Sequence, residues 1–255
     1  MTSDPAVPAE ANAPTPRGSR LISRLLPPAI RLWLHTQFDH LEGLEFAIDG
    51  QDRQILGGYL PAVMVTAHQA VYQGLHVSQA QVSAADIRVN LPQVLRGKPL
   101  RLLQPFPVAG QVTVLAEDLQ ASLRSHLLGQ ALQDALKLLL AGAEPQISPA
   151  PWLGDSNTAQ AAITLGADRL TLRWPGPTPA ADSLELTLNL TMQAGRQLCL
   201  CQPVVTQRSP QGELRPPIAL DDMTFDLGPE VDIRQLSVTP QGIDLVGTVR
   251  VIPAD

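Results

Sequence analysis

Aromatic residues and positive charge are scarce in this chain of 255 residues. Phe, Trp and Tyr together make up 4% of the sequence, too few to form a stacking surface for single-stranded nucleic acid. The formal net charge of −6 and the pI near 5.3 also disfavour binding to a phosphate backbone, which requires a basic surface. The composition therefore argues against nucleic acid as a partner.

Long hydrophobic runs are also missing. Polar residues interrupt every stretch of about 20 residues, so no transmembrane helix is predicted. The first 19 residues, MTSDPAVPAEANAPTPRGS, have no apolar core and are rich in Pro and Ala. This composition is typical of a disordered lead rather than a secretory signal. We expect residues 1–19 to be disordered and the protein to be cytoplasmic, or peripheral on the cytoplasmic side of a membrane.

Only two cysteines are present, Cys199 and Cys201, within RQLCLCQPV. On a strand, this spacing places both side chains on one face, a poor arrangement for a disulfide between them. They are most simply interpreted as two small hydrophobic side chains in a reducing compartment. A metal site would need further His or Cys ligands, which the neighbouring sequence lacks. We predict no metal and no cofactor.

Catalytic motifs are missing as well. The sequence has no G-x-S-x-G elbow, and Gly97-Lys98 lacks the upstream glycine and the following Ser or Thr of a phosphate-binding loop. The acidic residues between Asp221 and Asp232 are too widely spaced for a calcium loop. We therefore predict a protein that is not an enzyme and has no catalytic residues. Catalysis of an unknown class remains the third alternative.

Charge is absent from a long internal window. No Asp, Glu, Lys or Arg occurs between Gln54 and Ala85, although the sequence there alternates between apolar and polar residues as a β-hairpin does. A sheet with one solvated face usually carries charges on that face. The pattern therefore raises the question of what the two faces of this hairpin contact.

The alternation in this window also changes phase. The apolar positions are odd-numbered at Leu75 and Val77, even-numbered at Val82, and odd-numbered again at Ile87. Because a regular strand buries one face only, each change predicts a bulge or bend, near residues 78–79 and 85–86. We expect a strongly curved sheet.

Residues 20–38 are predicted to form a helix with one apolar stripe. All charges between residues 11 and 38 are positive, and they belong to Arg17, Arg20, Arg24 and Arg31. Two interpretations remain open. The helix packs on the core with its arginines in water, or it lies on an anionic membrane surface with Trp33 at the interface.

The clearest helical segment runs from Ala116 to Gly142. Leucines follow one another along one side, and Glu117 and Asp118 suit the positive start of the helix. Gly129 and the preceding Arg124-Ser125-His126 are candidate break points. A helix with so wide an apolar surface is expected to be buried on several sides.

Alternating segments occur both before and after this helix, which indicates an α+β fold. We expect a curved antiparallel β-sheet system packed against the N-terminal helix and the long Leu-rich central helix. The predicted domain spans residues 20–253, and its halves 20–142 and 155–253 are joined by the Pro-rich linker EPQISPAPWLGD.

Such a sheet has Val, Ala and Leu on one face and Gln, Ser, Thr and His on the other. An aliphatic cleft with few fixed polar groups suits an acyl chain better than a flat polar metabolite. The alternative is that these side chains fill a solid core, in a structural adaptor at the membrane. The candidate lipid contacts are Val63, Val65, Leu75, Val77, Val82, Leu123, Leu127 and Leu136.

Three segments resemble one known family. They are RQILGGYLPAVMVTAHQAVYQGLHVSQAQVSAADIRVNLPQVLRGKP, PVAGQVTVLAEDLQASLRSHLL and DLGPEVDIRQLSVTPQGIDLVGTVRVIP. Together they are similar to the bacterial LmeA-like phospholipid-binding family, formerly a domain of unknown function, and most to its cyanobacterial branch. The resemblance covers roughly residues 21–253. It implies phospholipid as the partner, at or near a membrane, without a reaction, and it transfers no catalytic or lipid-contact residues.

Overall fold

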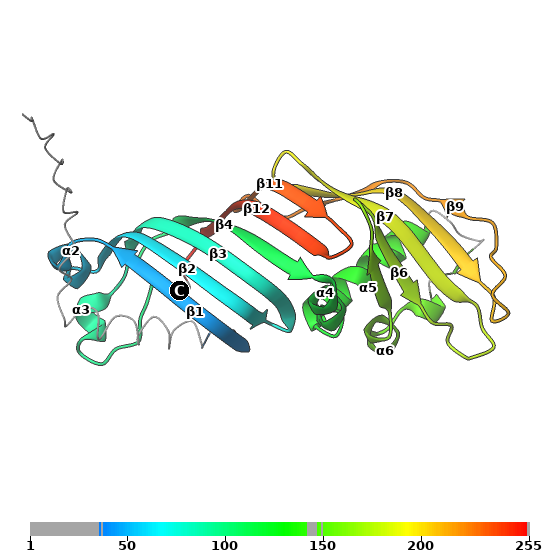
Figure 1. Ribbon diagram of the computed structural model, residues 1–255, viewed down its shortest axis with the longest axis horizontal. Coiled ribbons are helices and arrows are strands. Elements are labelled where there is room, and N and C mark those ends of the chain that lie inside the picture. The colour runs from blue at the N-terminus through cyan, green and yellow to red at the C-terminus, as the bar shows by residue number, and fades with distance from the viewer. Residues whose placement is uncertain (1–35, 37, 142–146, 149, 254–255) are drawn as a thin grey trace, which may run out of the picture.

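Two twisted antiparallel β-sheets follow one another along the long axis of the molecule, with helices beside the second (Figure 1). The computed structural model describes residues 36, 38–141, 147–148 and 150–253. The predicted α+β class is confirmed in its coarse form, because antiparallel strands dominate and a few helices pack beside them.

The first sheet has six strands in the order β1-β2-β3-β4-β12-β11. The last two strands come from the C-terminal end of the chain and pair through β12 with β4. The first sheet therefore joins segments from both sides of the Pro-rich linker. The strand bounds are β1 His40–Asp49, β2 Tyr59–Tyr72, β3 Leu75–Arg88, β4 Phe106–Leu115, β11 Val231–Val238 and β12 Gly242–Val251.

The second sheet follows the order β10-β8-β7-β6-β5, and the short β9 pairs with β8. The first half of β7 alternates between buried and partly exposed residues. This pattern is expected of a sheet that covers a core with one face. The bounds are β5 Ala162–Leu165, β6 Leu170–Trp174, β7 Ser183–Gln193, β8 Gln197–Arg208, β9 Ile218–Ala219 and β10 Met223–Asp226.

The two sheets meet where the β7–β8 turn contacts β11. The backbone N–H of Ile233 donates a hydrogen bond to the carbonyl oxygen of Gly195, with an N···O distance of 2.6 Å. The turn therefore extends the hydrogen bonding of the first sheet's edge strand.

The predicted central helix is broken at one of its two candidate points. Helix α4 spans Ala116–Ser122, and α5 begins at His126 and ends at Ala141. The Ser125 hydroxyl accepts a hydrogen bond from the Leu128 N–H at 3.1 Å, which satisfies one free donor of the first turn of α5. Gly129 lies inside α5 and does not interrupt it.

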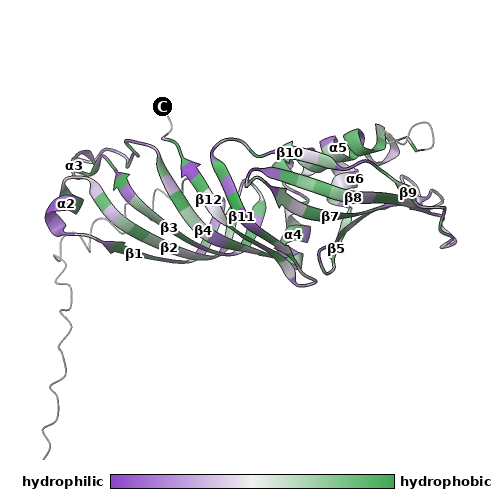
Figure 2. Cartoon of the chain, turned by 90° about the horizontal axis from the view of Figure 1, so that it is seen from above, coloured by the Kyte–Doolittle hydropathy of each residue, from purple (hydrophilic) through white to green (hydrophobic). Residues whose placement is uncertain are grey.

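Helix α5 supplies the largest hydrophobic core by packing against the second sheet. Leu136 and Leu140 are fully buried there, together with Trp174 and Leu184 from the sheet. Figure 2 shows α5 and long stretches of both sheets in the green of hydrophobic residues. The other short helices are α2 Asp52–Leu56, α3 Leu91–Val94, η1 Ala150–Trp152 and α6 Asp155–Ala159.

The phase changes predicted in the β2–β3 hairpin coincide with two irregular positions. Strand β3 is continuous from Leu75 to Arg88, but its register with β2 has no pair at Gln69/Ser78 and none at Pro61/Asp86. Gln69 has φ of 53° and Asp86 has φ of 56°, a left-handed conformation that turns the following side chain to the other face. The hairpin therefore bends without breaking its ladder.

The predicted lead 1–19 and residues 20–35 and 37 of the predicted N-terminal helix lie outside the described residues, and they include Arg17, Arg20, Arg24, Arg31 and Trp33. The extent of the predicted domain stays a prediction. Among the described residues, no helix is both long and apolar enough to cross a membrane.

Candidate functional site

One side of the first sheet, which we call the apolar face, carries no polar side chain in its paired rows. The registers place Val65 opposite Val82, and Val82 opposite Gly110. The row continues through Gly247 to Ile233 on the edge strand. The neighbouring rows have the same character. The face consists of Phe46, Ile48, Val63, Val65, Ala67, Ala80, Val82, Ala84, Val108, Gly110, Val112, Val114, Val231, Ile233, Leu236, Val238, Ile243, Leu245, Gly247 and Val249.

Both ends of the apolar face are covered by described residues. At one end, Val63 and Val108 pack into a cluster with Ile55 of α2 and Leu91 of α3. At the other end, Val238 and Ile243 pack against Leu119 of α4 and side chains of the second sheet. These contacts fix the sheet at both ends and account for its buried residues there.

The middle of the apolar face is different. Phe46, Val82, Val112 and Ile233 belong to neither cluster among the described residues, and each is only partly buried. Partly exposed hydrophobic side chains on four strands of one sheet, β1, β3, β4 and β11, form an extended hydrophobic surface. We call these four residues, with the glycines between them, the middle band.

Two glycines facing each other form the floor of the middle band. Gly110 and Gly247 are register partners on β4 and β12. A Cβ at Gly110 would lie 2.7 Å from Val82 Cγ1, and one at Gly247 would lie 2.9 Å from Ile233 Cδ1. Val82 and Ile233 therefore lean over the glycines, and no larger residue fits there without displacing them.

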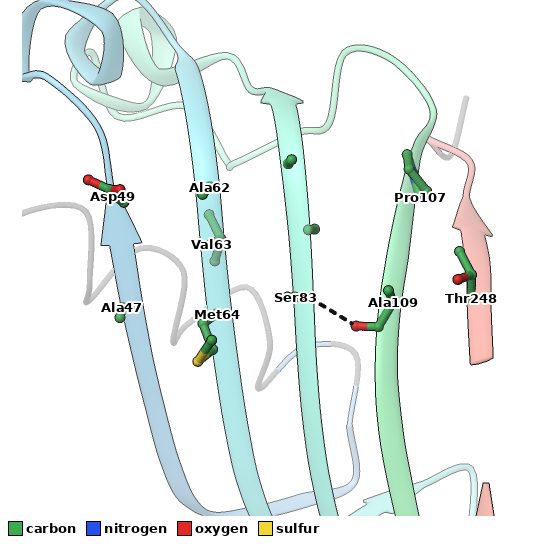
Figure 3. Close-up of a pocket in the computed structure, with 11 residues that line it drawn as sticks. Ala47, Asp49, Ala62, Val63, Met64, Ser83, Pro107, Ala109 and Thr248 are labelled. Atoms are coloured by element: carbon green, nitrogen blue, oxygen red, sulfur yellow. Dashed lines mark hydrogen bonds between the residues drawn. The ribbon is translucent and has the colours of Figure 1, made fainter. Parts of the chain in front are cut away.

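The opposite side of the first sheet, which we call the mixed face, contains a hollow of about 630 Å³ (Figure 3). Its floor is formed by small side chains, including Ala47, Ala62, Ala85 and Ala109, with Met64 beside them. Ser83, Asp49 and Thr248 add polar groups at its edges. On the mixed face, the uncharged window contributes Ala, Gln, Ser and Thr from β2 and β3, whereas the charges of the same rows, such as Glu45, Asp49 and Asp232, lie on other strands. The window therefore places its polar, uncharged side chains on the mixed face and its apolar side chains on the apolar face.

A smaller hollow of about 400 Å³ lies at the far end of the β2–β3 hairpin, where β3 contacts α4. His40, His76 and Asp118 line it. The Ser78 hydroxyl donates to the Asp118 carboxylate and accepts from the Leu115 N–H at 2.7 Å, which ties the irregular position of β3 to α4. These polar contacts serve the junction of sheet and helix.

Of the lipid contacts predicted from the sequence, Val63, Val65 and Val82 lie together on the apolar face. Val63 belongs to the covered end, whereas Val82 lies in the middle band. Leu75 and Val77 lie beyond the irregular pair Gln69/Ser78, near the turn of the hairpin.

The predicted helical contacts lie elsewhere. Leu123 and Leu136 are buried in the core between α5 and the second sheet, and Leu127 is 43% exposed at the start of α5. The structure does not bring these leucines to the valines of the first sheet.

Sequence reasoning missed several residues of the middle band. Val112, Gly110, Ile233 and Gly247 come from strands that were recognised as alternating but were not assigned to this sheet. The apolar alternation of GQVTVLA and GIDLVGTVRV was a usable signal, because two alternating strands of matched length can pair directly. Which strands pair is a long-range property that the alternation alone leaves open.

The two cysteines lie on one face of β8, as predicted, with their Sγ atoms 2.6 Å apart. The chain brings Asp222 to them, and a carboxylate oxygen lies within 4.8 Å of both sulfurs. The hydrogen bond from the neighbouring Cys201 and burial raise the pKa of the Cys199 thiol. Two thiolates and a carboxylate could serve as three of the four ligands of a tetrahedral zinc ion. Asp222 is the ligand that sequence spacing did not reveal.

A comparison with protein-family models finds one match over residues 17–248, to the family described as LmeA-like phospholipid-binding. A search of curated proteins and a search of solved structures each found no significant match. The family match covers nearly the whole chain and includes every strand of both sheets except the end of β12.

Proposed function

Because the chain belongs to the LmeA-like phospholipid-binding family, we propose that it binds a phospholipid with the acyl chains on the middle band of the apolar face. The observation that carries this proposal is the partial exposure of Val82, Val112 and Ile233 between two covered ends. Each methylene that leaves water for such a surface contributes about 0.8 kcal/mol.

The dimensions of the apolar face suit an acyl chain. Neighbouring strands lie about 4.8 Å apart, so the five spacings of a six-stranded sheet span about 24 Å. The acyl chains of one leaflet fill about 15 Å, half of the hydrocarbon core of a bilayer. A chain that lies across the strands is therefore accommodated within the sheet.

The proposed binding is non-covalent, and the protein acts as a lipid carrier or as a sensor at a membrane surface. The hydrocarbon side chains of the middle band offer no nucleophile and no general base to a bound lipid. The headgroup remains at the edge of the sheet, where it keeps its contact with water.

Native mass spectrometry of the purified protein, followed by extraction and identification of lipids, tests the proposal. We expect a complex with one phospholipid, which dissociates on activation to leave the apo mass. A clean apo mass, and no uptake on incubation with phospholipid vesicles, would instead favour the membrane adaptor with a solid core. Transfer of a labelled phospholipid between two vesicle populations then distinguishes a carrier from a static binder.

A further inference from the structure

One end of the molecule exposes leucines that its core does not use. Helices α2 and α3 lie side by side at this end, with the segment 95–105 that returns to β4 (Figure 1). Leu56 is 46% exposed, Leu95 is 51% exposed and Leu103 is 59% exposed. We call α2, α3 and residues 95–105 the tip.

These leucines are exposed although the tip is firmly anchored. Ile55, the neighbour of Leu56, is 4% exposed and packs into the cluster at the covered end of the apolar face. Leu91 and Leu102 anchor α3 and the following segment in the same cluster. Ile55, Leu91 and Leu102 hold the tip on the sheet. The exposed leucines are not needed for this packing, so they are free to contact something outside the protein.

The tip is also basic in an acidic protein, because it carries four cations and one carboxylate, that of Asp52 at the start of α2. No Asp or Glu occurs between residues 87 and 116, whereas Arg96, Lys98 and Arg101 fall in that stretch. All three are exposed, as is Arg53 on α2, and none of the four forms an ion pair with another described residue. The nearest acidic residue of β3, Asp86, is engaged by the hydroxyl of Tyr59.

We propose that the tip docks on an anionic phospholipid bilayer, with its leucines in the interface and its cations at the headgroups. This inference rests on the proposed function, since it names the surface from which the protein would take or deliver its phospholipid. Leucines that enter the interface and cations that meet anionic lipids act together, because neither alone holds a protein on a membrane stably. A bilayer fits this end better than an acidic protein does, because Leu95 and Leu103 are exposed on either side of the cations in the sequence.

The position of the tip fits this role. The cluster that anchors it includes Val63 and Val108, which begin the apolar face. Docking by the tip therefore brings the covered end of the apolar face close to the bilayer. A phospholipid would reach the middle band by passing along this end of the sheet.

Flotation with vesicles of phosphatidylcholine, with and without phosphatidylglycerol, tests the tip. Each cation contributes about fivefold in affinity near an anionic leaflet, so the combined change Arg96→Gln, Lys98→Gln and Arg101→Gln should weaken binding about one hundredfold. The matched control is Arg124→Gln, Lys137→Gln and Arg169→Gln, three exposed cations away from the tip. The control should bind like the wild type, and raising the salt should weaken both.

The leucines are tested separately. Leu95→Ser with Leu103→Ser should abolish flotation, whereas Leu138→Ser with Leu214→Ser should not, although Leu138 is 57% and Leu214 is 59% exposed. Equal losses in the tip and control variants, or wild-type protein that does not float with either vesicle, would overturn the inference. Native mass spectrometry of the same variants keeps the two proposals apart. In the wild-type protein, retained phospholipid without flotation would contradict docking by the tip alone, and flotation without retained phospholipid would contradict the proposed function alone. In the tip variants, we expect phospholipid to be retained while flotation is lost.

Discussion

Val82 on β3 lies opposite Gly110 on β4, and a Cβ on that glycine would come within 2.7 Å of the valine's Cγ1. This close approach keeps the valine methyl groups above the sheet in the middle band. A hydroxyl in place of a methyl group here would meet an acyl chain without a hydrogen-bond partner. Such burial costs about 1–2 kcal/mol per group.

We therefore expect Val82→Thr with Val112→Thr to weaken phospholipid retention by about tenfold or more, measured by native mass spectrometry and by lipid uptake from vesicles. The matched control is Val246→Thr, because Val246 pairs with Gln111 and belongs to the mixed face. Val246 is partly buried, as Val82 and Val112 are, so each substitution places a hydroxyl group at a partly buried position of the sheet. An equal loss in the control would place the lipid on the mixed face instead.

The bend of β3 at Asp86 leads to a prediction about stability. Asp86 has φ of 56°, a conformation that Asp, Asn and Gly tolerate and Ala does not. Asp86→Ala should lower the free energy of unfolding by about 1–2 kcal/mol, and Asp86→Asn or Asp86→Gly by less. Chemical denaturation checks the order. If Ala proves as stable as Gly, the left-handed backbone does not contribute to the bend.

The same residue controls the ionisation of Tyr59. The hydrogen bond to Asp86 raises the pKa of Tyr59 above 10.0, helped by desolvation and the negative carboxylate and opposed by Arg88. The protonated phenol is thus favoured in the folded state, so its contribution is complete below the ordinary pKa and is lost as pH rises through the raised one. Asp86→Asn should lower the pKa of Tyr59 in an ultraviolet titration, with Tyr59→Phe identifying the signal. An unchanged titration would contradict the hydrogen bond.

The sequence predicted those features that depend on the spacing of apolar residues within one short segment. The phase changes after Val77 and before Ile87 located both irregular pairs of the hairpin, because a strand cannot change its buried face without a special backbone conformation. The sequence offered two break points for the Leu-rich helix, Gly129 and the preceding Arg124-Ser125-His126, and the helix breaks at the second. A polar segment interrupts the apolar stripe there, and the Ser125 hydroxyl meets the new helix start.

Contacts between distant segments were not accessible in this way. Alternation assigns a strand but does not select its neighbour, so the pairing of β12 with β4 and the separation into two sheets appear only in the structure. Leu123 and Leu136 were predicted to contact the lipid, but both are buried in the core beside the second sheet. A helical pattern predicts that a helix has an apolar side and does not show which sheet that side packs against. The approach of Asp222 to the cysteines likewise depends on the pairing of β10 with β8.

The N-terminal arginines provide a second, independent test of membrane contact. If residues 20–38 lie on an anionic membrane, Arg17→Gln, Arg20→Gln and Arg24→Gln should weaken sedimentation with anionic liposomes by about tenfold or more, since each cation contributes about 1 kcal/mol. Thermal stability should change little, because exposed charges contribute little to folding. Unchanged binding would make this segment a core element with its arginines in water.

The contact between Gly195 and Asp232 gives the last prediction, which concerns the junction of the two sheets. Gly195 has φ of +72°, and a Cβ there would lie 2.1 Å from Asp232 Oδ1. Gly195→Ala should lower the free energy of unfolding by about 2 kcal/mol or more, through both backbone strain and the clash.

The control is Gly212→Ala, where φ is +90° and no atom lies within 4 Å, so only the strain should appear. Asp232→Ala in the Gly195→Ala background should recover the steric part, since the next atom of residue 232 that remains is Cα at 3.7 Å. Denaturation of the four variants of this cycle measures the coupling. Strictly additive losses would mean that the turn does not press against β11, and the sheets would then be joined by the backbone hydrogen bond from Ile233 to Gly195 without this side-chain contact.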